Sequence, residues 1–241
     1  MTGSSSSEAI GHVQSSSTLV VQHLEHEGSG LVGSLLAERG STIRTVRAWR
    51  GEPVPRTVPN DIDALVVLGG DMGWHQADEH PHLRDEVALL SDAVSRGVRT
   101  LGLCLGAQLL AVATGGSVTP SMPEFGYLPL EVLDPTDQVG ALLVGARVLS
   151  LHSDDLSVGP GAVVLARTPR CVHAFRTGSG LGLQFHPEFD HAALTSVCAG
   201  PGFEDYLRGG GWSTAALLAD AEGREPAVAA HGNALLAAWL A

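Results

Sequence analysis

Cys104 has the surroundings of a reactive cysteine. It stands between two glycines in Gly-Leu-Cys-Leu-Gly (102–106), where an apolar run typical of a buried strand meets a run with helical spacing. This is the form of a nucleophile elbow, with sulfur in place of the serine oxygen. Flanking glycines relieve the crowding of a sharp strand-to-helix turn, and the N-terminus of the following helix favours thiolate over thiol. The pattern predicts that Cys104 is a nucleophile.

A second pattern supplies the base that such a cysteine needs, because a cysteine alone is often only a small core residue. His186 and Glu188 lie two positions apart at the end of the apolar run 180–188, so both side chains project from the same side of a strand. A neutral imidazole can accept the thiol proton while a carboxylate holds the other ring proton and fixes the tautomer. The three residues predict a Cys-His-Glu triad for covalent catalysis.

The elements that must position this triad alternate between strands and helices in the first half of the chain. The apolar and amphipathic runs predict strands at 18–24, 41–49, 63–70 and 98–104, and helices at 30–40, 81–97 and 105–116. Such alternation predicts right-handed βαβ units, and therefore an α/β fold with an open, mostly parallel central sheet and helices on both faces. Ligands bind beyond the carboxyl ends of the strands in these sheets, which groups Gly69–Gly70, Cys104 and His186.

The second half has a different pattern. Residues 117–135 are rich in proline and glycine, and no strand is assigned to them. Short apolar runs at 146–152, 162–166, 171–176 and 180–188 predict mixed or antiparallel strands that extend the sheet. Two helices are predicted at 213–223 and 226–241. We expect residues 1–17, which are serine-rich, to be a disordered leader, and residues 18–241 to form a single domain.

Composition excludes several classes of partner. The chain has 26 acidic and 14 basic residues, a net charge of −12 and no lysine, which disfavours nucleic acid and anionic membranes as partners. No apolar run approaches the roughly 20 residues that span a bilayer. The three cysteines form no CxxC pair, and free thiols fit a reducing cytoplasm. These features predict a soluble cytoplasmic protein.

Beyond the triad, several longer motifs resemble the class I, or triad-type, glutamine amidotransferases. They occur in that family's order and together cover roughly residues 18 to 190. The motifs are VVLGGDMGW, GLCLGAQLLA, EFGY, LHSDDLSVGPGAVVLA, HAFR and GLQFHPE. The resemblance implies the flavodoxin-like fold of that family and a stand-alone glutaminase domain that needs no metal or organic cofactor.

The resemblance also implies a role for each matched position. Cys104 would attack the side-chain carboxamide of glutamine and form a γ-glutamyl thioester with release of ammonia. His186 would transfer the protons, and Glu188 would orient His186. The remaining implied site residues are Gly70 and Leu105, whose backbone amides would form the oxyanion hole, and Gln108, Ser153 and Asp154, which would contact the amino acid end of glutamine.

The identity of the substrate stays open at this point. In the leading hypothesis the substrate is glutamine, and ammonia passes to a separate synthetase. The alternative is a hydrolase-only enzyme that cleaves a γ-glutamyl peptide or γ-glutamyl amine. A non-catalytic binding module is a third possibility, against which the intact triad argues. Two departures from the family fall near the expected substrate rim: His173 replaces a usual glutamine, and LHSDD lacks the tryptophan often found before its histidine. Glycine is also the usual residue where Ser153 stands.

Other residues that could do chemistry receive a plain interpretation. Histidines and acids at 74–82 match no defined metal-binding spacing, so we expect a solvated loop there. Cys171 and Cys198 are interpreted as core thiols.

Overall fold

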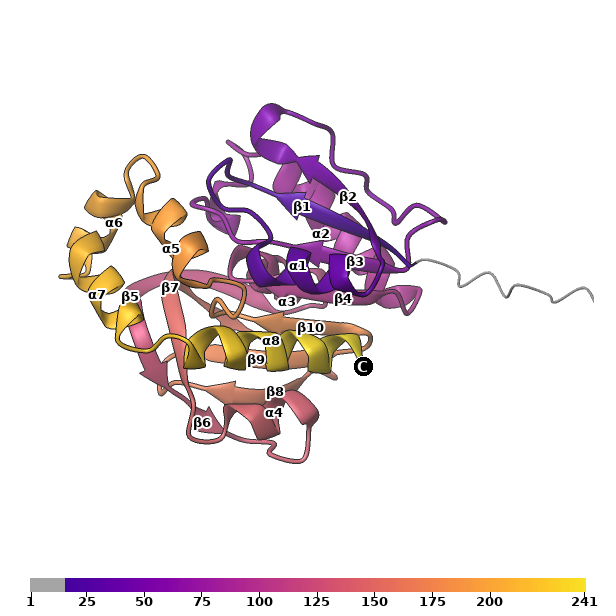
Figure 1. Ribbon diagram of the computed structural model, residues 1–241. Helices are drawn as coiled ribbons and strands as arrows, with labels where there is room; N and C mark the ends of the chain where they lie inside the picture. Colours follow the sequence, from indigo (N-terminus) through magenta and orange to yellow (C-terminus); the bar gives the residue numbers. More distant parts are fainter. Residues whose placement is uncertain (1–15) are drawn as a thin grey trace, which may run out of the picture.

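A single eight-stranded sheet organises the protein, for which a computed structural model describes residues 16–241 (Figure 1). The strand order is β2-β1-β3-β4-β10-β9-β8-β6. The parallel strands are β2 (Thr42–Arg47), β1 (Ser17–Gln22), β3 (Ala64–Val67), β4 (Arg99–Leu103) and β10 (Gly180–Leu183). The antiparallel strands are β9 (Val172–Thr177), β8 (Val163–Arg167) and β6 (Glu131–Val132). The predicted α/β fold with a mostly parallel sheet is confirmed.

Helices cover both faces of this sheet because its central strands are apolar on both sides. In β1, Leu19 and Val21 enter one core and Val20 the other. The first core lies under α2 (His82–Ser95) and α3 (Leu105–Ala113). The second lies under α1 (Gly30–Glu38), α4 (Gln138–Leu143) and α8 (Ala227–Leu240). Two short 3-10 turns, Ala48–Arg50 and Trp74–Gln76, follow β2 and β3.

A separate two-stranded sheet differs from the prediction. β7 (Arg147–Ser157) was expected to extend the main sheet, but it pairs antiparallel with β5 (Ser117–Pro129) instead. No strand was predicted for β5 because of its prolines. Proline is tolerated in edge strands, and both strands of a two-stranded sheet have a free edge. The pairing register also shifts between Pro120 and Glu124, which absorbs the irregularity.

Three helices pack beside this second sheet and form a third core with it (Figure 1). They are α5 (His191–Cys198), α6 (Phe203–Gly209) and α7 (Thr214–Glu222). The helices predicted at 213–223 and 226–241 correspond to α7 and α8, whereas α4, α5 and α6 were not predicted. No helix in the described part of the chain is long and apolar enough to cross a membrane.

The predicted leader, residues 1–17, falls outside the described residues except for its last two positions. Of these, Ser17 is already the first residue of β1.

Candidate active site

Cys104 occupies a strained turn between β4 and α3. Its φ of 48° and ψ of −106° make it the one non-glycine residue with a positive φ among residues 16–241. A Cβ atom added to Gly102 would collide with the backbone of Gly106, and one added to Gly106 would collide with the Val67 carbonyl. Both glycines are therefore required for this turn, which has the geometry that the sequence predicted. The N-terminus of α3 lies next to the sulfur and stabilises negative charge there.

His186 and Glu188 follow β10 and reach the same edge of the sheet. The two are joined by a hydrogen bond of 2.7 Å between His186 Nδ1 and Glu188 Oε1. The imidazole also stacks on Phe189, with 4.5 Å between ring centroids. Because Glu188 accepts the Nδ1 proton, Nε2 is the nitrogen left for Cys104, which is a hydrogen-bond partner of this ring. Burial alone would lower the pKa of His186, but Glu188 and Cys104 together raise it well above its usual value.

A buried histidine fixes the orientation of the Gly69–Gly70 peptide. His23 Nδ1 donates to the Gly69 carbonyl at 2.7 Å, and His23 Nε2 lies 2.8 Å from Glu86 Oε2. The carbonyl of Gly69 and the N–H of Gly70 belong to one planar trans peptide, so they point in opposite directions. Gly70 lies against Leu105. A Cβ atom added to Gly70 would come within 2.9 Å of the Leu105 side chain.

The His23–Glu86 contact is an ion pair inside the protein. Burial disfavours the charged form of His23, but the negative charge and hydrogen bond of Glu86 outweigh it and raise the pKa of His23. Burial would likewise raise the pKa of Glu86, yet His23 and His82 lower it. Both side chains therefore stay charged, and His82 Nδ1 donates to the second Glu86 oxygen at 2.9 Å.

A pair of hydrogen-bonded glutamines contacts the Cys104 sulfur through Gln184. Gln108 Nε2 donates to Gln184 Oε1 at 3.2 Å, and Gln184 Nε2 lies 3.6 Å from Cys104 Sγ. A donor directed at the sulfur favours the thiolate. Gln184 was not among the predicted site residues, although it lies two positions before His186 and therefore on the same side of the chain.

One cavity of about 430 Å³ brings the predicted residues together. Its wall includes His186 and the other predicted residues Gly70, Cys104, Leu105, Gln108, Ser153 and Asp154. Glu188 does not reach the cavity, since it lies behind His186 and is only 1% exposed. Seven of the eight predicted residues thus line one space, and the eighth supports it.

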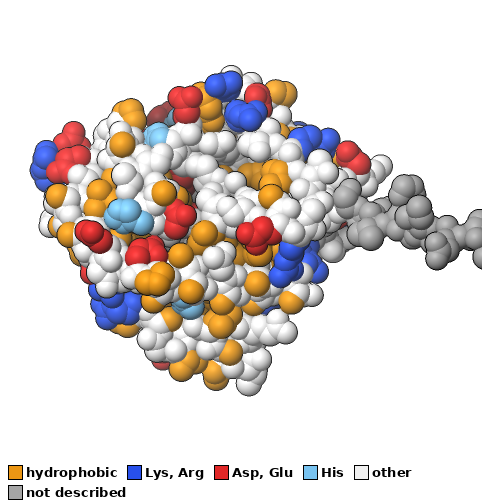
Figure 2. Space-filling view, viewed as in Figure 1, with side chains coloured by type: hydrophobic (Ala, Val, Ile, Leu, Met, Phe, Trp, Pro, Cys, Tyr) orange, Lys and Arg blue, Asp and Glu red, His pale blue; other side chains and the backbone are white. Residues whose placement is uncertain are grey.

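On the face in Figure 2, arginines lie in small separate groups with acidic side chains between them.

The cavity wall also contains residues that the sequence did not point to, among them Glu27, His75 and Tyr206. Glu27 is buried with Oε1 unpartnered, and burial raises its pKa to about 7 against the opposing charge of His186. His75 belongs to the loop that we expected to be merely solvated, and its Nδ1 lies 3.7 Å from Asp154 Oδ2. Tyr206 comes from α6. A signal existed for Glu27, which follows β1 at the same edge of the sheet as Cys104.

His173, in contrast, does not lie at the cavity rim. It is completely buried in β9, outside the cavity wall, where it donates to Glu124 at 2.9 Å.

Comparison with known proteins agrees with this arrangement. A profile described as glutamine amidotransferase class-I matches residues 34–197. A GMP synthase [glutamine-hydrolyzing] from Aeropyrum pernix is 39% identical over 145 residues, which cover 58% of this chain and 26% of that protein. The chain spans about a quarter of the length of the GMP synthases that it matches.

Two solved structures have the same fold. A glutamine amidotransferase from Methylobacillus flagellatus superposes with a TM-score of 0.80 and 27% identity, covering 94% of each chain. Another, from Thermotoga maritima, superposes with a TM-score of 0.80 and 24% identity, covering 93% of this chain and 98% of that one. Together with the profile match over more than half of its length, these findings show that the chain belongs to the class I glutamine amidotransferase family.

Proposed function

We propose that the chain hydrolyses the γ-carboxamide of glutamine through a γ-glutamyl thioester on Cys104. The observation that carries this proposal is a thiol in a strained elbow, open to a cavity and hydrogen-bonded to a histidine that Glu188 orients. Such an arrangement serves acyl transfer because the turn presents the nucleophile to the cavity and the neighbouring imidazole can take its proton.

The raised pKa of His186 defines the order of proton transfers. In the first step His186 takes the proton of the Cys104 thiol, and the raised pKa of His186 favours the protonated imidazole. The thiolate attacks the carboxamide carbon, and His186 gives its proton to the nitrogen as the C–N bond breaks, which releases ammonia. The neutral imidazole then takes a proton from water, and the resulting hydroxide attacks the thioester. Glutamate leaves, and Cys104 is again a thiolate beside a protonated imidazole.

Two backbone amides stabilise the tetrahedral intermediate in this proposal. Leu105 is the first residue of α3, so its N–H has no acceptor within the helix. The Gly70 N–H is aimed by His23, which holds the carbonyl of the same peptide from the opposite side. Loss of one oxyanion donor typically costs about 10²- to 10³-fold in kcat. His23 is therefore a positioning residue that acts through Gly70.

The amino acid end of glutamine would lie against Gln108, Ser153 and Asp154. Burial raises the pKa of Asp154, which means that its carboxylate is poorly solvated in the free protein. An α-ammonium group placed beside it would replace the lost solvation. This pairing supports Asp154 as the residue that recognises the charged end of the substrate.

Released ammonia would pass to a separate synthetase in the cytoplasm. The similarity to part of each GMP synthase supports transfer of ammonia as the purpose of the reaction.

A second candidate function is hydrolysis of a larger γ-glutamyl peptide or γ-glutamyl amine without ammonia transfer. The size of the cavity favours it, because about 430 Å³ falls in the range of roughly 300–1,000 Å³ that drug-sized ligands occupy. The cavity is thus not restricted to one amino acid.

A substrate panel tests both functions. The purified protein is incubated with glutamine and with γ-glutamyl amides of increasing size, and free glutamate is measured. Glutamine turnover that rises when a synthetase is added supports the first function. Efficient turnover of conjugates with negligible turnover of glutamine supports the second. Release of glutamate from no substrate would overturn both.

A further inference from the structure

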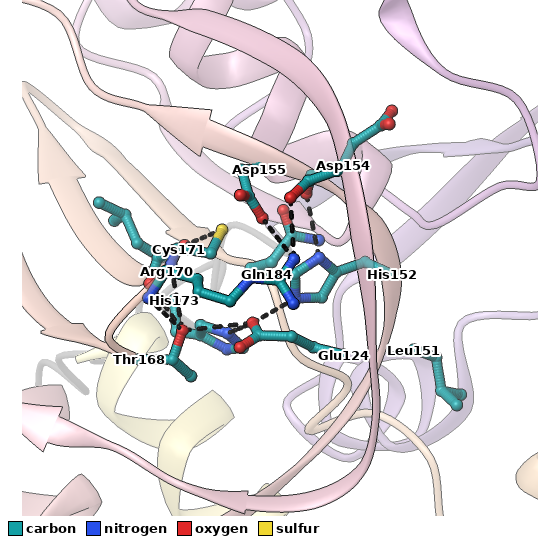
Figure 3. Close-up of polar contacts among 12 residues, drawn as sticks. Glu124, Leu151, His152, Asp154, Asp155, Thr168, Arg170, Cys171, His173 and Gln184 are labelled. Atoms are coloured by element: carbon teal, nitrogen blue, oxygen red, sulfur yellow. Dashed lines mark hydrogen bonds and ion pairs between the residues drawn. The ribbon is translucent and has the colours of Figure 1, made fainter. Parts of the chain in front are cut away.

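A second cluster of reactive side chains lies behind the cavity wall, between the two sheets. It contains His152 of β7, His173 of β9 and Cys171, which immediately precedes β9 (Figure 3). One ring nitrogen of each histidine and the Cys171 sulfur lie within 4.8 Å of one another. None of the three side chains is more than 2% exposed, and only His152 borders the cavity. The proposed reaction uses none of them.

The hydrogen bonds of the two histidines determine which nitrogen carries a lone pair. His152 Nδ1 lies 3.0 Å from the Asp154 carbonyl oxygen, which can only accept, so Nδ1 carries the proton. His173 Nε2 donates to Glu124 Oε2 at 2.9 Å. In a neutral imidazole the opposite nitrogen is then an acceptor. Both opposite nitrogens, His152 Nε2 and His173 Nδ1, are buried without a hydrogen-bond partner.

Those two orphaned lone pairs need an explanation, because an unsatisfied buried polar atom costs about 1–3 kcal/mol. His152 Nε2 lies 3.3 Å from Glu124 Oε2, in a contact that lacks hydrogen-bond geometry. A third orphan, Asp155 Oδ1, is also buried, and the Arg170 guanidinium lies 3.8 Å away, too far for a hydrogen bond. The carboxylate of Asp155 is, however, not among the donor atoms that lie within 4.8 Å of one another, so it is not a ligand in this arrangement. One cation between the two imidazoles and the Cys171 sulfur would satisfy both histidine nitrogens.

The chemical types of the donor atoms indicate which cation they would bind. Two imidazoles and a thiolate are ligands that select zinc-like ions over calcium or magnesium. Zinc-binding histidines usually donate their second N–H to a carboxylate or a backbone carbonyl, as His173 does to Glu124 and His152 to Asp154. With Zn–S near 2.3 Å and Zn–N near 2.0–2.1 Å, tetrahedral ligand atoms stand about 3.3–3.6 Å apart. The cluster reaches this geometry by closing about 1 Å.

We propose that His152, Cys171 and His173 bind a zinc ion, with the fourth coordination position left to water. Zn²⁺ binds His152 Nε2, His173 Nδ1 and Cys171 Sγ, and the thiol proton of Cys171 passes to water. Nothing is oxidised or reduced. The ion joins β7 to β9 and so fixes the part of β7 that carries Ser153 and Asp154 in the cavity wall.

Metal analysis of tag-free protein tests this proposal. The protein carries Cys104→Ala, which removes the active-site thiol as a competing ligand. It is stripped with a chelator, equilibrated with Zn²⁺ and analysed by elemental mass spectrometry and by titration against a zinc indicator. We expect one zinc ion per chain, and more than about 100-fold weaker binding in Cys171→Ser and His173→Gln. Cys198→Ser is the matched control and should bind zinc like its parent.

Cobalt provides a second measurement that does not depend on stability. Co²⁺ in the site should give the charge-transfer absorption of a cobalt–thiolate bond, present with Cys198→Ser and absent with Cys171→Ser. Circular dichroism identifies any variant that fails to fold. If Cys171→Ser does not fold, the cobalt spectrum of the folded parent is recorded before and after alkylation of Cys171 instead. Absence of tight zinc binding in the parent would overturn the proposal. So would zinc binding that Cys171→Ser and His173→Gln leave unchanged.

Discussion

Two buried clusters of this protein use nearly the same side chains in different ways. Cys104 and His186 line the cavity with Glu188 behind them, whereas Cys171 and His173 lie behind the wall and only His152 of the second cluster borders the cavity. Cys104 has a positive φ and the N-terminus of α3 beside it. Cys171 precedes an ordinary strand, and burial raises its pKa to about 12, so without a metal its thiol stays protonated. Backbone geometry and access, rather than residue type, separate a nucleophile from a structural thiol.

The largest effect that this comparison predicts follows from removing the Cys104 thiol, which borders the cavity. Cys104→Ala should abolish glutamate release, a loss of at least about 10⁴-fold in kcat, because no other group can form the thioester. Cys198→Ala is the matched control and should retain activity within a few-fold. Steady-state assays with glutamine check both variants. Comparable rates for Cys104→Ala and the wild type would remove the distinction between the clusters.

Glu188→Gln should reduce kcat by about 10²- to 10⁴-fold with a smaller change in KM, since the amide no longer stabilises the imidazolium. Without the charge of Glu188 the pKa of His186 falls, so the protonated imidazole is lost at lower pH. The alkaline limb of the pH–rate profile should therefore move to lower pH. An unchanged profile would mean that Glu188 plays no part in the proton transfers.

Glu27→Gln tests the electrostatics around Cys104 and His186 through the pH dependence of the free energy of unfolding. A carboxyl whose pKa rises from 4.5 to about 7 on folding contributes stability that is complete below pH 4.5 and lost as the pH rises to 7. The wild type should lose on the order of 3 kcal/mol through this group over that interval. In Glu27→Gln that loss should be absent. Urea unfolding of both proteins at pH 4.5 and pH 8 measures the difference, and equal pH dependence in both would contradict it.

His23→Ala should lower kcat by about 10- to 100-fold with little change in KM, because the Gly70 N–H is no longer held toward the cavity. His23→Gln keeps a donor for the Gly69 carbonyl and should recover part of the rate. His82→Gln is the matched control, since His82 touches Glu86 but not the peptide. An increase in KM without a decrease in kcat would assign His23 a structural role only. The same conclusion would follow if His23→Gln recovered none of the rate.

Local patterns predicted the triad, and tertiary packing explains what they missed. The elbow needs only the residues 102–106, and His186 with Glu188 needs only a strand end, so a short sequence window contains each pattern. Glu27 and Tyr206, however, reach the cavity from a loop and from α6, which no local spacing connects to Cys104. Their roles depend on a fold that the sequence specifies only as a whole.

The fold shows the same division. The alternating βα half was predicted nearly element by element because its apolar periods are strong. β5 was missed because Pro120 and Pro123 argue against a strand unless the strand has a free edge. The pairing of β7 with β5 could not be read from β7 itself, whose apolar run suits either sheet.

The central claim is that Cys104 alone carries the glutamyl group, and peptide mapping after an acid quench tests it most directly. Protein mixed with glutamine for a few milliseconds should carry the added mass of one γ-glutamyl group on the peptide that contains Cys104. The peptides containing Cys171 and Cys198 should be unmodified. Glutamate release without any adduct on Cys104, or with an adduct on another cysteine, would contradict the account.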